Sequence, residues 1–446
     1  MFDRAGKRIL SAALPKRSPS DSQRLVTAGA QSADSASLSL ADFFIGETGD
    51  PLAPPEGFSE WRRETAWATS LYEPELLGAP EPRCRVSVAG REHTVINLAS
   101  YNYLGLARHP EVVAAIQEAV ACYGSGACGS PILSGMTDLH RELERRITAF
   151  LGREATLLFN SGFGGAMGCL GGLLRRGDAV LADASAHVSL IDGAQLSRAK
   201  LELFAHNDPA ALAAAIERAP AHRRLVVVEG IYSMEGDAAD LPAICEIAER
   251  RGASVFIDEA HSALACGANG RGMSEQHGVE QRIGLYYGTF SKAFAGLGGF
   301  VSGRAETIDY LRCYAHSYGF SCALPPATVA GLLAALDVGT RDGGRRQRLV
   351  ENAGYFRGGL HRLGLDTGAS ISHVVPIMIG SAAPRLYQMG RALLRRGLML
   401  APIDYPAVPQ DRVRFRASIT SAHSREDLDE ALSIINDVIV RGQLDA

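Results

Sequence analysis

Apolar residues in the middle of the chain fall into short runs that end at glycine or an acidic residue. Between these runs, apolar positions repeat with helical spacing, as in HPEVVAAIQEAVACYG (109–124), DLHRELERRITAFLG (138–152) and LPAICEIAERRG (241–252). Alternating strands and helices predict an α/β fold whose mostly parallel sheet is covered by helices on both faces. The runs that predict buried strands are TLLFN (156–160), AVLAD (179–183), LVVVEG (225–230), SVFIDEA (254–260) and LYYGTF (285–290).

The N-terminal segment lacks any such periodicity. Residues 1–40 are rich in serine, alanine and glutamine, which predicts a disordered tail. A transit peptide is the alternative, but Asp3, Asp21 and Asp34 depart from the acid-poor pattern of such peptides.

The remainder is expected to divide into three parts. Residues 41–99 would form an N-terminal arm with small-domain elements, and residues 100–330 a large cofactor-binding domain. Residues 331–446 would form a smaller C-terminal α+β domain, because a long helical region there is followed by the strand patterns SHVVPIMIG (372–380) and VRFRASIT (413–420).

Composition narrows the functional classes. The net charge is 45 − 49 = −4 with no basic block in the body, which argues against a nucleic-acid surface. No apolar run is long enough to cross a bilayer as a helix. The eight cysteines are scattered without a C-x-x-C pair, which is typical of reduced core residues and predicts a cytoplasmic location.

Lysine is scarce: only four of the 45 basic residues are lysines. Lys7 and Lys16 lie in the tail, and Lys200, in SRAKLELF, is expected at the surface. Lys292 follows a predicted buried strand and precedes AFAGLGG, an unusual setting for a solvated side chain. Chemistry that requires an amine therefore has one main candidate.

Polar residues follow four of the predicted strands. In open parallel sheets, ligands bind beyond the carboxyl ends of the strands, so these residues are expected to share one site. Glycines at a helix start also allow a phosphate to approach the backbone closely. The four groups are Asn160-Ser161-Gly162-Phe163, the run ADASAHVSLID (182–192) with His187, Asp258-Glu259-Ala260-His261, and Gly288-Thr289-Phe290-Ser291-Lys292.

A nucleotide loop is a competing interpretation. The segment 162–168 fits G-x-G-x-x-x-G, and Asp183 follows at a spacing of 183 − 162 = 21 residues, as a nicotinamide cofactor requires. That motif normally opens the first strand–helix–strand unit, however, and this interpretation gives Asp258, His261 and Lys292 no role.

Pyridoxal phosphate accounts for all four groups. This cofactor needs a lysine for its Schiff base, a carboxylate beside its pyridine nitrogen and a cup for its phosphate. Lys292, Asp258 and the loop at 161–163 can supply these, and His187 can stack on the ring. No metal site is assigned.

Five motifs together resemble the α-oxoamine synthases, a pyridoxal-phosphate family of fold type I that includes serine palmitoyltransferase and aminooxononanoate synthase. The resemblance runs from about Ser100 to the C-terminus, and ADASAHVSLIDG and GTFSKA are similar to the serine palmitoyltransferase branch in particular. It implies a homodimer with the active site between subunits. The motifs are NYLGL (102–106), VVVEGIYSMEGD (226–237), VFIDEAHS (255–262), GANGRG (267–272) and GTFSKAFAGLGGF (288–300).

The resemblance also implies a role for each site residue. Lys292 would form the Schiff base and act as acid and base at Cα, Asp258 would pair with the pyridine nitrogen, and His261 with the phenolic oxygen. Asn102 and Arg416 would hold the carboxylate of the amino acid, which suits the planar fork of arginine. Arg414 is the nearby competitor on the same strand face. The remaining cofactor contacts would be Ser161, Gly162, Phe163, His187, Ser233, Thr289 and Ser291.

The expected reaction is a decarboxylative Claisen condensation of serine, alanine or glycine with an acyl thioester, either acyl coenzyme A or an acyl carrier protein. Pro131 stands where several relatives carry arginine, and with Ile132 it favours an apolar acyl chain. An aminotransferase, an aldolase and a catalytically silent partner subunit are the alternatives. The N-terminal arm, with residues 1–40 ahead of it, is a candidate docking segment for a carrier protein.

Overall fold

The computed structural model describes residues 38–43, 49–64, 71–88, 90–219, 222–380 and 383–444. Lys7, Lys16 and nearly all of the predicted tail, with its suggested role in carrier-protein docking, lie outside the described residues.

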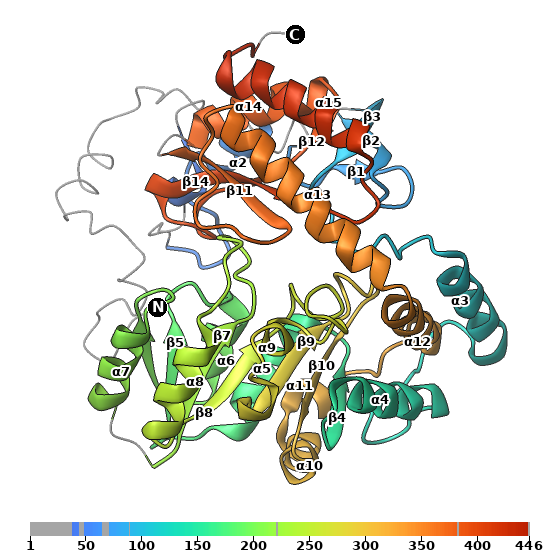
Figure 1. Cartoon of the computed structure of the whole chain (residues 1–446), viewed down its shortest axis with the longest axis vertical. Coiled ribbons are helices and arrows are strands. Elements are labelled where there is room, and N and C mark those ends of the chain that lie inside the picture. The colour runs from blue at the N-terminus through green and yellow to red at the C-terminus, as the bar shows by residue number, and fades with distance from the viewer. Residues whose placement is uncertain are drawn as a thin grey trace.

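A seven-stranded mixed sheet forms the lower half of the molecule in Figure 1. All neighbouring strands are parallel except β10, which is antiparallel to both β4 and β9. The five predicted strands are confirmed, each beginning within one residue of its expected position. In spatial order the strands are β4 (Ala155–Phe159), β10 (Gly299–Gly303), β9 (Leu285–Thr289), β8 (Ser254–Asp258), β7 (Arg224–Glu229), β5 (Ala179–Asp183) and β6 (Lys200–Phe204).

Strand β10 was not predicted, because its sequence GFVSG is short and lies between two glycines. It separates β4 from β9, and its first residue lies against the loop after β4. A Cβ built on Gly299 would approach the Cα of Gly162 to 3.0 Å. The strand therefore holds the Gly162 loop next to the end of β9.

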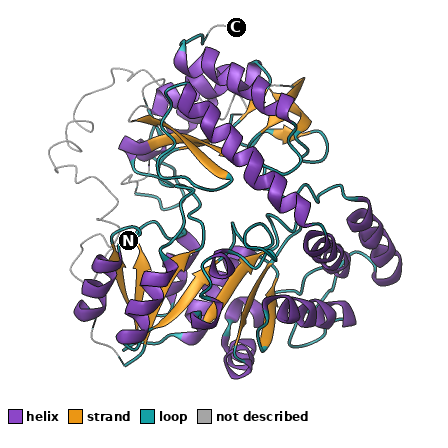
Figure 2. Cartoon of the chain, viewed as in Figure 1, coloured by secondary structure: helices purple, strands orange, loops and turns teal. Residues whose placement is uncertain are grey.

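Helices cover both faces of the sheet, as predicted (Figure 2). On one face α5, α6 and α10 pack against the sheet; on the other, α4, α7, α8 and α12 do so. Helix α3 packs on α12 at the edge of this half (Figure 1). The helices are α3 (Pro110–Tyr123), α4 (Asp138–Leu151), α5 (Gly162–Leu173), α6 (Val188–Leu196), α7 (Pro209–Arg218), α8 (Leu241–Arg250), α9 (Met273–Gln276), α10 (Ala305–Tyr314), α11 (His316–Gly319) and α12 (Pro326–Arg341).

Elements from both ends of the chain build the upper half in Figure 1, around one hydrophobic cluster. One sheet has the order β1-β2-β3-β12 and the other β11-β14-β13. The domain boundaries themselves stay a prediction. The elements are α2 (Phe58–Glu64), β1 (Glu75–Leu76), β2 (Arg83–Val88), β3 (Arg91–Asn97), α13 (Gly343–Arg362), β11 (Val374–Gly380), α14 (Ala383–Arg395), β12 (Leu398–Met399), β13 (Ala401–Ile403), β14 (Val413–Ser418) and α15 (Arg425–Ile435).

The cysteine prediction was half wrong. All eight are free, as expected, and Cys84, Cys169 and Cys245 are buried. Four others are exposed on helix ends and loops: Cys122, Cys128, Cys313 and Cys322. In the part of the chain that the structure describes, we find no helix with the length and apolar character needed to cross a membrane.

Candidate active site

Lys292 lies three residues beyond Thr289, the last residue of β9, and is half-buried at the carboxyl end of the large sheet. Burial lowers the pKa of its ammonium to about 8, and the negative charges of Asp258 and Glu229 oppose that shift. An amine with a pKa near neutrality is partly deprotonated, which is the form that attacks a carbonyl. Lys200, in contrast, lies at the surface, where its Nζ donates to the carbonyl of Arg218.

Asp258 and Glu229 end neighbouring strands and face each other in the register of the sheet. Their residues are only 4% and 2% exposed, respectively. Burial raises the pKa of both carboxyls, and the charge of Asp258 raises that of Glu229 further. The Lys292 ammonium pulls both pKa values down. Two buried acids beside one cation would be stabilised by a further positive charge.

His187 caps the start of α6 and lies beside Phe163, with ring centroids 6.3 Å apart. Its backbone N–H donates to Glu229 Oε1 at 2.6 Å, so the strand-end acid fixes where the histidine stands. Burial, and then the cations Lys292 and Arg416, lower the pKa of the imidazole to about 4. A neutral ring at this position is suited to stacking on a flat aromatic ligand.

The predicted phosphate loop starts α5, where Ser161 caps the helix by accepting from the N–H of Gly164 at 3.0 Å. A Cβ on Gly162 would approach Thr289 Oγ1 to 2.8 Å, so only glycine permits this contact. The hydroxyls of Thr289 and Ser291 lie 2.8 Å apart. Free N–H groups of a helix start and two hydroxyls thus converge, as a phosphate requires.

His261 is buried behind Asp258, where its Nδ1 shares a hydrogen bond of 2.8 Å with the hydroxyl of Tyr103. Burial lowers the pKa of this imidazole well below its usual value, and Lys292 and Arg416 lower it further. The ring of His373 also lies beside Tyr103, with 4.1 Å between ring centroids. The ring of His261 is therefore held in one orientation by the core.

Arg416, from β14, reaches the site from the upper half of the molecule. It is 4% exposed; its Nη1 donates to the carbonyl of Ser233 at 3.0 Å and its Nη2 to the hydroxyl of Tyr101. Among the described residues no carboxylate pairs with this guanidinium, and its buried Nε has no hydrogen-bond partner. A buried arginine without an acid is costly and favours an anionic ligand.

Arg414, two residues earlier on the same face of β14, is in a different electrostatic state. Its side chain is fully buried, but it pairs with Glu235 at 2.9 Å and donates to the carbonyl of Met234 at 2.9 Å. The charge of Arg416, in contrast, lowers the pKa of Lys292 and His187. Of the two arginines left open by the sequence, Arg416 is the one with unsatisfied charge at the site.

Asn102 lies between the two site tyrosines, but its side chain is engaged with the backbone. Its Oδ1 accepts from the N–H of Leu106 at 2.8 Å, and its Nδ2 donates to the carbonyl of Pro80 at 3.3 Å. The structure therefore assigns Asn102 the folding of its own loop, and its predicted contact with a substrate carboxylate stays a prediction.

Three site residues were missed by the sequence analysis: Tyr101, Tyr103 and Glu229. A signal existed for Glu229, which ends the predicted strand LVVVEG just as Asp258 ends the next one. The tyrosines carried no comparable signal, because their partners Arg416 and His261 lie far away in the sequence.

The residues present fit pyridoxal phosphate. A protonated pyridine nitrogen would supply the further positive charge that Asp258 and Glu229 lack. At the phosphate loop, Gly162 leaves a space beside Thr289 that a Cβ would fill. Lys292 is the only lysine at this edge of the sheet among the described residues. The roles predicted for the individual residues remain predictions, but the structure brings these groups together.

Comparison with known proteins agrees with this arrangement. Residues 93–435 match the family model of aminotransferase class I and II. The chain is 40% identical to 8-amino-7-oxononanoate synthase of Geobacter sulfurreducens, over 81% of this chain and 93% of the relative. It is 41% identical to a putative 8-amino-7-oxononanoate synthase 2 of Mycobacterium tuberculosis over 81% of this chain and 47% of that protein, so it spans about half the length of this relative.

Among solved structures, serine palmitoyltransferase of Sphingomonas wittichii superposes with a TM-score of 0.78 at 31% identity, covering 82% of this chain and 92% of the other. Serine palmitoyltransferase of S. paucimobilis gives a TM-score of 0.79 at 32% identity, covering 83% and 93%. The fold and the site thus define a protein of the pyridoxal-phosphate class with fold type I. Within that class, the chain belongs to the α-oxoamine synthase family.

Proposed function

We propose that the protein condenses a small amino acid (serine, alanine or glycine) with an acyl thioester, releasing carbon dioxide and the free thiol and leaving a 2-amino ketone. The observation that carries the proposal is the buried guanidinium of Arg416, which lies close to Lys292 and pairs with no acid among the residues that the structure describes. A carboxylate is the group that such an arginine binds best, and an amino acid bound there lies within reach of the one lysine of the site.

Pyridoxal phosphate, when bound, would supply an electron sink for the charge left when the Cα proton departs. Lys292 would remove and later return that proton, with its lowered pKa near the working pH. Asp258 would hold a proton on the pyridine nitrogen, and His187 and His261 would position the ring. Ser161, Gly162, Phe163, Ser233, Thr289 and Ser291 would complete the cofactor contacts, with the phosphate held at the start of α5.

Arg416 would fix the carboxylate so that the Cα–H bond faces Lys292, and Asn102 is its predicted helper. After the Cα carbon has attacked the thioester carbonyl and displaced the thiol, the product is a β-keto acid, which loses carbon dioxide. Pro131 and the half-exposed Ile132 give the adjacent loop an apolar surface that suits an apolar acyl chain.

A homodimer is part of the proposal. Leu133 and Phe320 are 83% and 86% exposed, and neighbouring Ile132 is 51% exposed, so apolar side chains gather on the loops around the site. Exposed apolar side chains in such number favour burial against a second copy. We also propose a cytoplasmic location, supported by eight cysteines that all remain unpaired.

The decisive experiment offers serine, alanine and glycine to the cofactor-loaded protein together with acyl coenzyme A thioesters of several chain lengths. Carbon dioxide and free thiol should appear in equal amounts, and mass spectrometry should identify the amino ketone. Carbon dioxide release that does not depend on the thioester would contradict the proposal, and amino-group transfer or retro-aldol products would favour the alternative enzymes.

The lysine assignment is tested in parallel. Lys292→Ala should abolish both the visible absorbance of the covalently bound cofactor and product formation. Lys200→Ala is the matched control and should change neither, because this surface lysine contacts only Arg218 and Glu202. A Lys292→Ala protein that still holds its cofactor through a borohydride-reducible bond would refute the assignment.

A further inference from the structure

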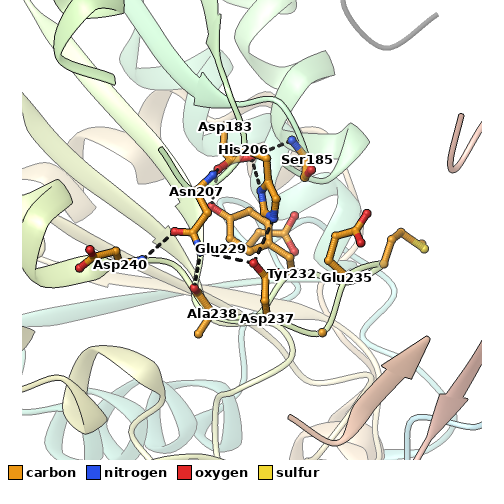
Figure 3. Close-up of polar contacts among 12 residues, drawn as sticks. Asp183, Ser185, His206, Asn207, Glu229, Tyr232, Glu235, Asp237, Ala238 and Asp240 are labelled. Carbon is orange, nitrogen blue, oxygen red and sulfur yellow. Dashed lines mark hydrogen bonds and ion pairs between the residues drawn. The ribbon is translucent and has the colours of Figure 1, made fainter. Parts of the chain in front are cut away.

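His206 lies between two carboxylates outside the cofactor site (Figure 3). Its Nδ1 is 2.9 Å from Asp183 Oδ1 and its Nε2 is 3.1 Å from Asp237 Oδ2. With an acid at each ring nitrogen, the imidazole satisfies both only as the doubly protonated cation. Burial alone would lower the pKa of His206, but the hydrogen bonds and charges of the two acids raise it to about 10.

The acid on the first side is the more deeply enclosed. Asp183 ends β5 and has no exposed surface; it also accepts from the hydroxyl of Tyr232 and the N–H of Asn207, each at 2.8 Å. Asn207 in turn donates from Nδ2 to the carbonyl of Ala238 at 2.8 Å. The ends of β5, β6 and β7 are thereby joined through one imidazolium (Figure 3).

The acid on the second side closes a tight turn. Within the turn 231–238, the N–H of Tyr232 donates to the carbonyl of Asp237 at 3.0 Å, and that of Gly236 to the carbonyl of Tyr232 at 2.8 Å. Gly236 has φ of 73°, and its carbonyl accepts from Ser372 Oγ at 2.8 Å. The turn is thus held by its own backbone hydrogen bonds and by the hydroxyl of Ser372.

This turn carries the groups that hold the two arginines of β14. The carbonyl of Ser233 accepts from Arg416 at 3.0 Å, and the carbonyl of Met234 accepts from Arg414 at 2.9 Å. Glu235 completes the set by pairing with Arg414. The position of the Arg416 guanidinium therefore depends on the position of the turn.

We propose that His206, clamped between Asp183 and Asp237, is a positioning residue for Arg416 and hence for the carboxylate of the amino acid. The inference rests on the carboxylate-binding role of Arg416 in the proposed function. Neutralising His206 breaks one of its two acid contacts, frees the turn and displaces the carbonyl of Ser233, and Arg416 moves with it. The cofactor contacts on the other strand ends are left in place.

The test compares each amino acid with the amine that lacks its carboxylate, for example serine with ethanolamine. Binding to the cofactor-loaded protein is read from the change in visible absorbance. In His206→Gln the dissociation constant for serine should rise about tenfold or more, as expected for a misplaced anchoring group. The constant for ethanolamine should stay within about twofold of wild type, and the constant for the cofactor should rise by less than that for serine, because Ser233 is the one proposed cofactor contact on the turn. His206→Lys, which keeps a cation between the acids, should restore part of the loss.

His222→Gln is the matched control, because His222 is exposed and precedes β7, at the opposite end of that strand from the turn. If His206→Gln does not fold, Asp237→Asn replaces it, since an amide opposite His206 removes one charge with little change of shape. Equal weakening of serine and ethanolamine, or no weakening of either, would overturn the proposal. Because this measurement needs no turnover, it tests the positioning role of His206 even if the wild type shows no thioester-dependent release of carbon dioxide.

Discussion

Replacing the two arginines of β14 by methionine should have different effects on stability, although the residues are two positions apart on one strand face. Arg414→Met removes an ion pair with Glu235 and hydrogen bonds to the carbonyls of Met234 and Arg412. Breaking a buried pair from one side costs about 3–5 kcal/mol when the remaining charge is uncompensated. Glu235 is partly exposed and keeps a longer pair with Arg412 at 3.6 Å, which places the expected cost at the lower end of this range. We expect a loss of that size in the free energy of unfolding.

Arg416→Met changes the free energy of unfolding in two opposing ways. It removes two hydrogen bonds of a charged donor, to Ser233 and Tyr101, worth about 1.5–3 kcal/mol each. It also removes a buried guanidinium that pairs with no acid in the described part of the chain, and the desolvation of this charge costs several kcal/mol. The terms are of similar size, so stability should stay within about 2 kcal/mol of wild type. Amino-acid affinity, in contrast, should fall about hundredfold or more, since a buried charged contact is worth about 2–5 kcal/mol.

Urea unfolding at saturating cofactor measures the first effect, and the visible absorbance change on adding serine measures the second. Both variants receive both assays, so each serves as the control for the other. If Arg416→Met were destabilised as strongly as Arg414→Met, the interpretation of Arg416 as an uncompensated charge would be wrong. If Arg414→Met instead lost amino-acid binding while remaining stable, the assignments of the two arginines would have to be exchanged.

Two further predictions concern stability. Gly236→Ala should lower the free energy of unfolding by about 3 kcal/mol or more, because φ of 73° disfavours a side chain and the new Cβ would meet the carbonyl oxygen of Val374 at 2.0 Å. Gly354→Ala, in the open middle of α13, should raise the free energy of unfolding by about 0.5–1 kcal/mol. Thermal unfolding measures both changes. The pKa of His206 is raised above 6.5 by Asp183 and Asp237. The contribution of His206 to the free energy of unfolding is therefore complete below pH 6.5 and declines as the pH rises towards 10. The loss of stability in His206→Gln should accordingly be largest near pH 6 and smaller at pH 9. A deficit that grows with pH would contradict this sign.

The sequence was most informative where chemistry is local to a strand end. Asp258 ends an apolar run and Lys292 lies just beyond the predicted strand LYYGTF, and in a parallel sheet such ends meet at one edge, so their proximity follows from the pattern alone. The same rule would have found Glu229. Strand β10 escaped because its glycines, needed where the backbone of Gly162 approaches, weaken every strand signal.

Contacts between distant segments were beyond this reasoning. The hydrogen bond between Arg416 and Tyr101 joins residues from the two ends of the chain, and nothing in the periodicity of either segment indicates the other. The choice between Arg414 and Arg416 is of the same kind. Both occupy the same face of one strand, and only the position of Glu235, fixed by the turn after β7, separates a neutralised arginine from an available one.

The charges of the site also indicate how the proposed amino acid, once joined to the cofactor, would be oriented. On the side of the large sheet, two buried acids share the Lys292 ammonium and have room for one more cation. On the side of β14, a buried guanidinium lacks any acid among the described residues. A ligand with a cationic ring nitrogen at one end and a carboxylate at the other satisfies both imbalances in only one orientation, since reversing it would place like charges together at low dielectric. Under the proposed function, the fold would thus select the direction of binding before any contact to the side chain of the amino acid is made.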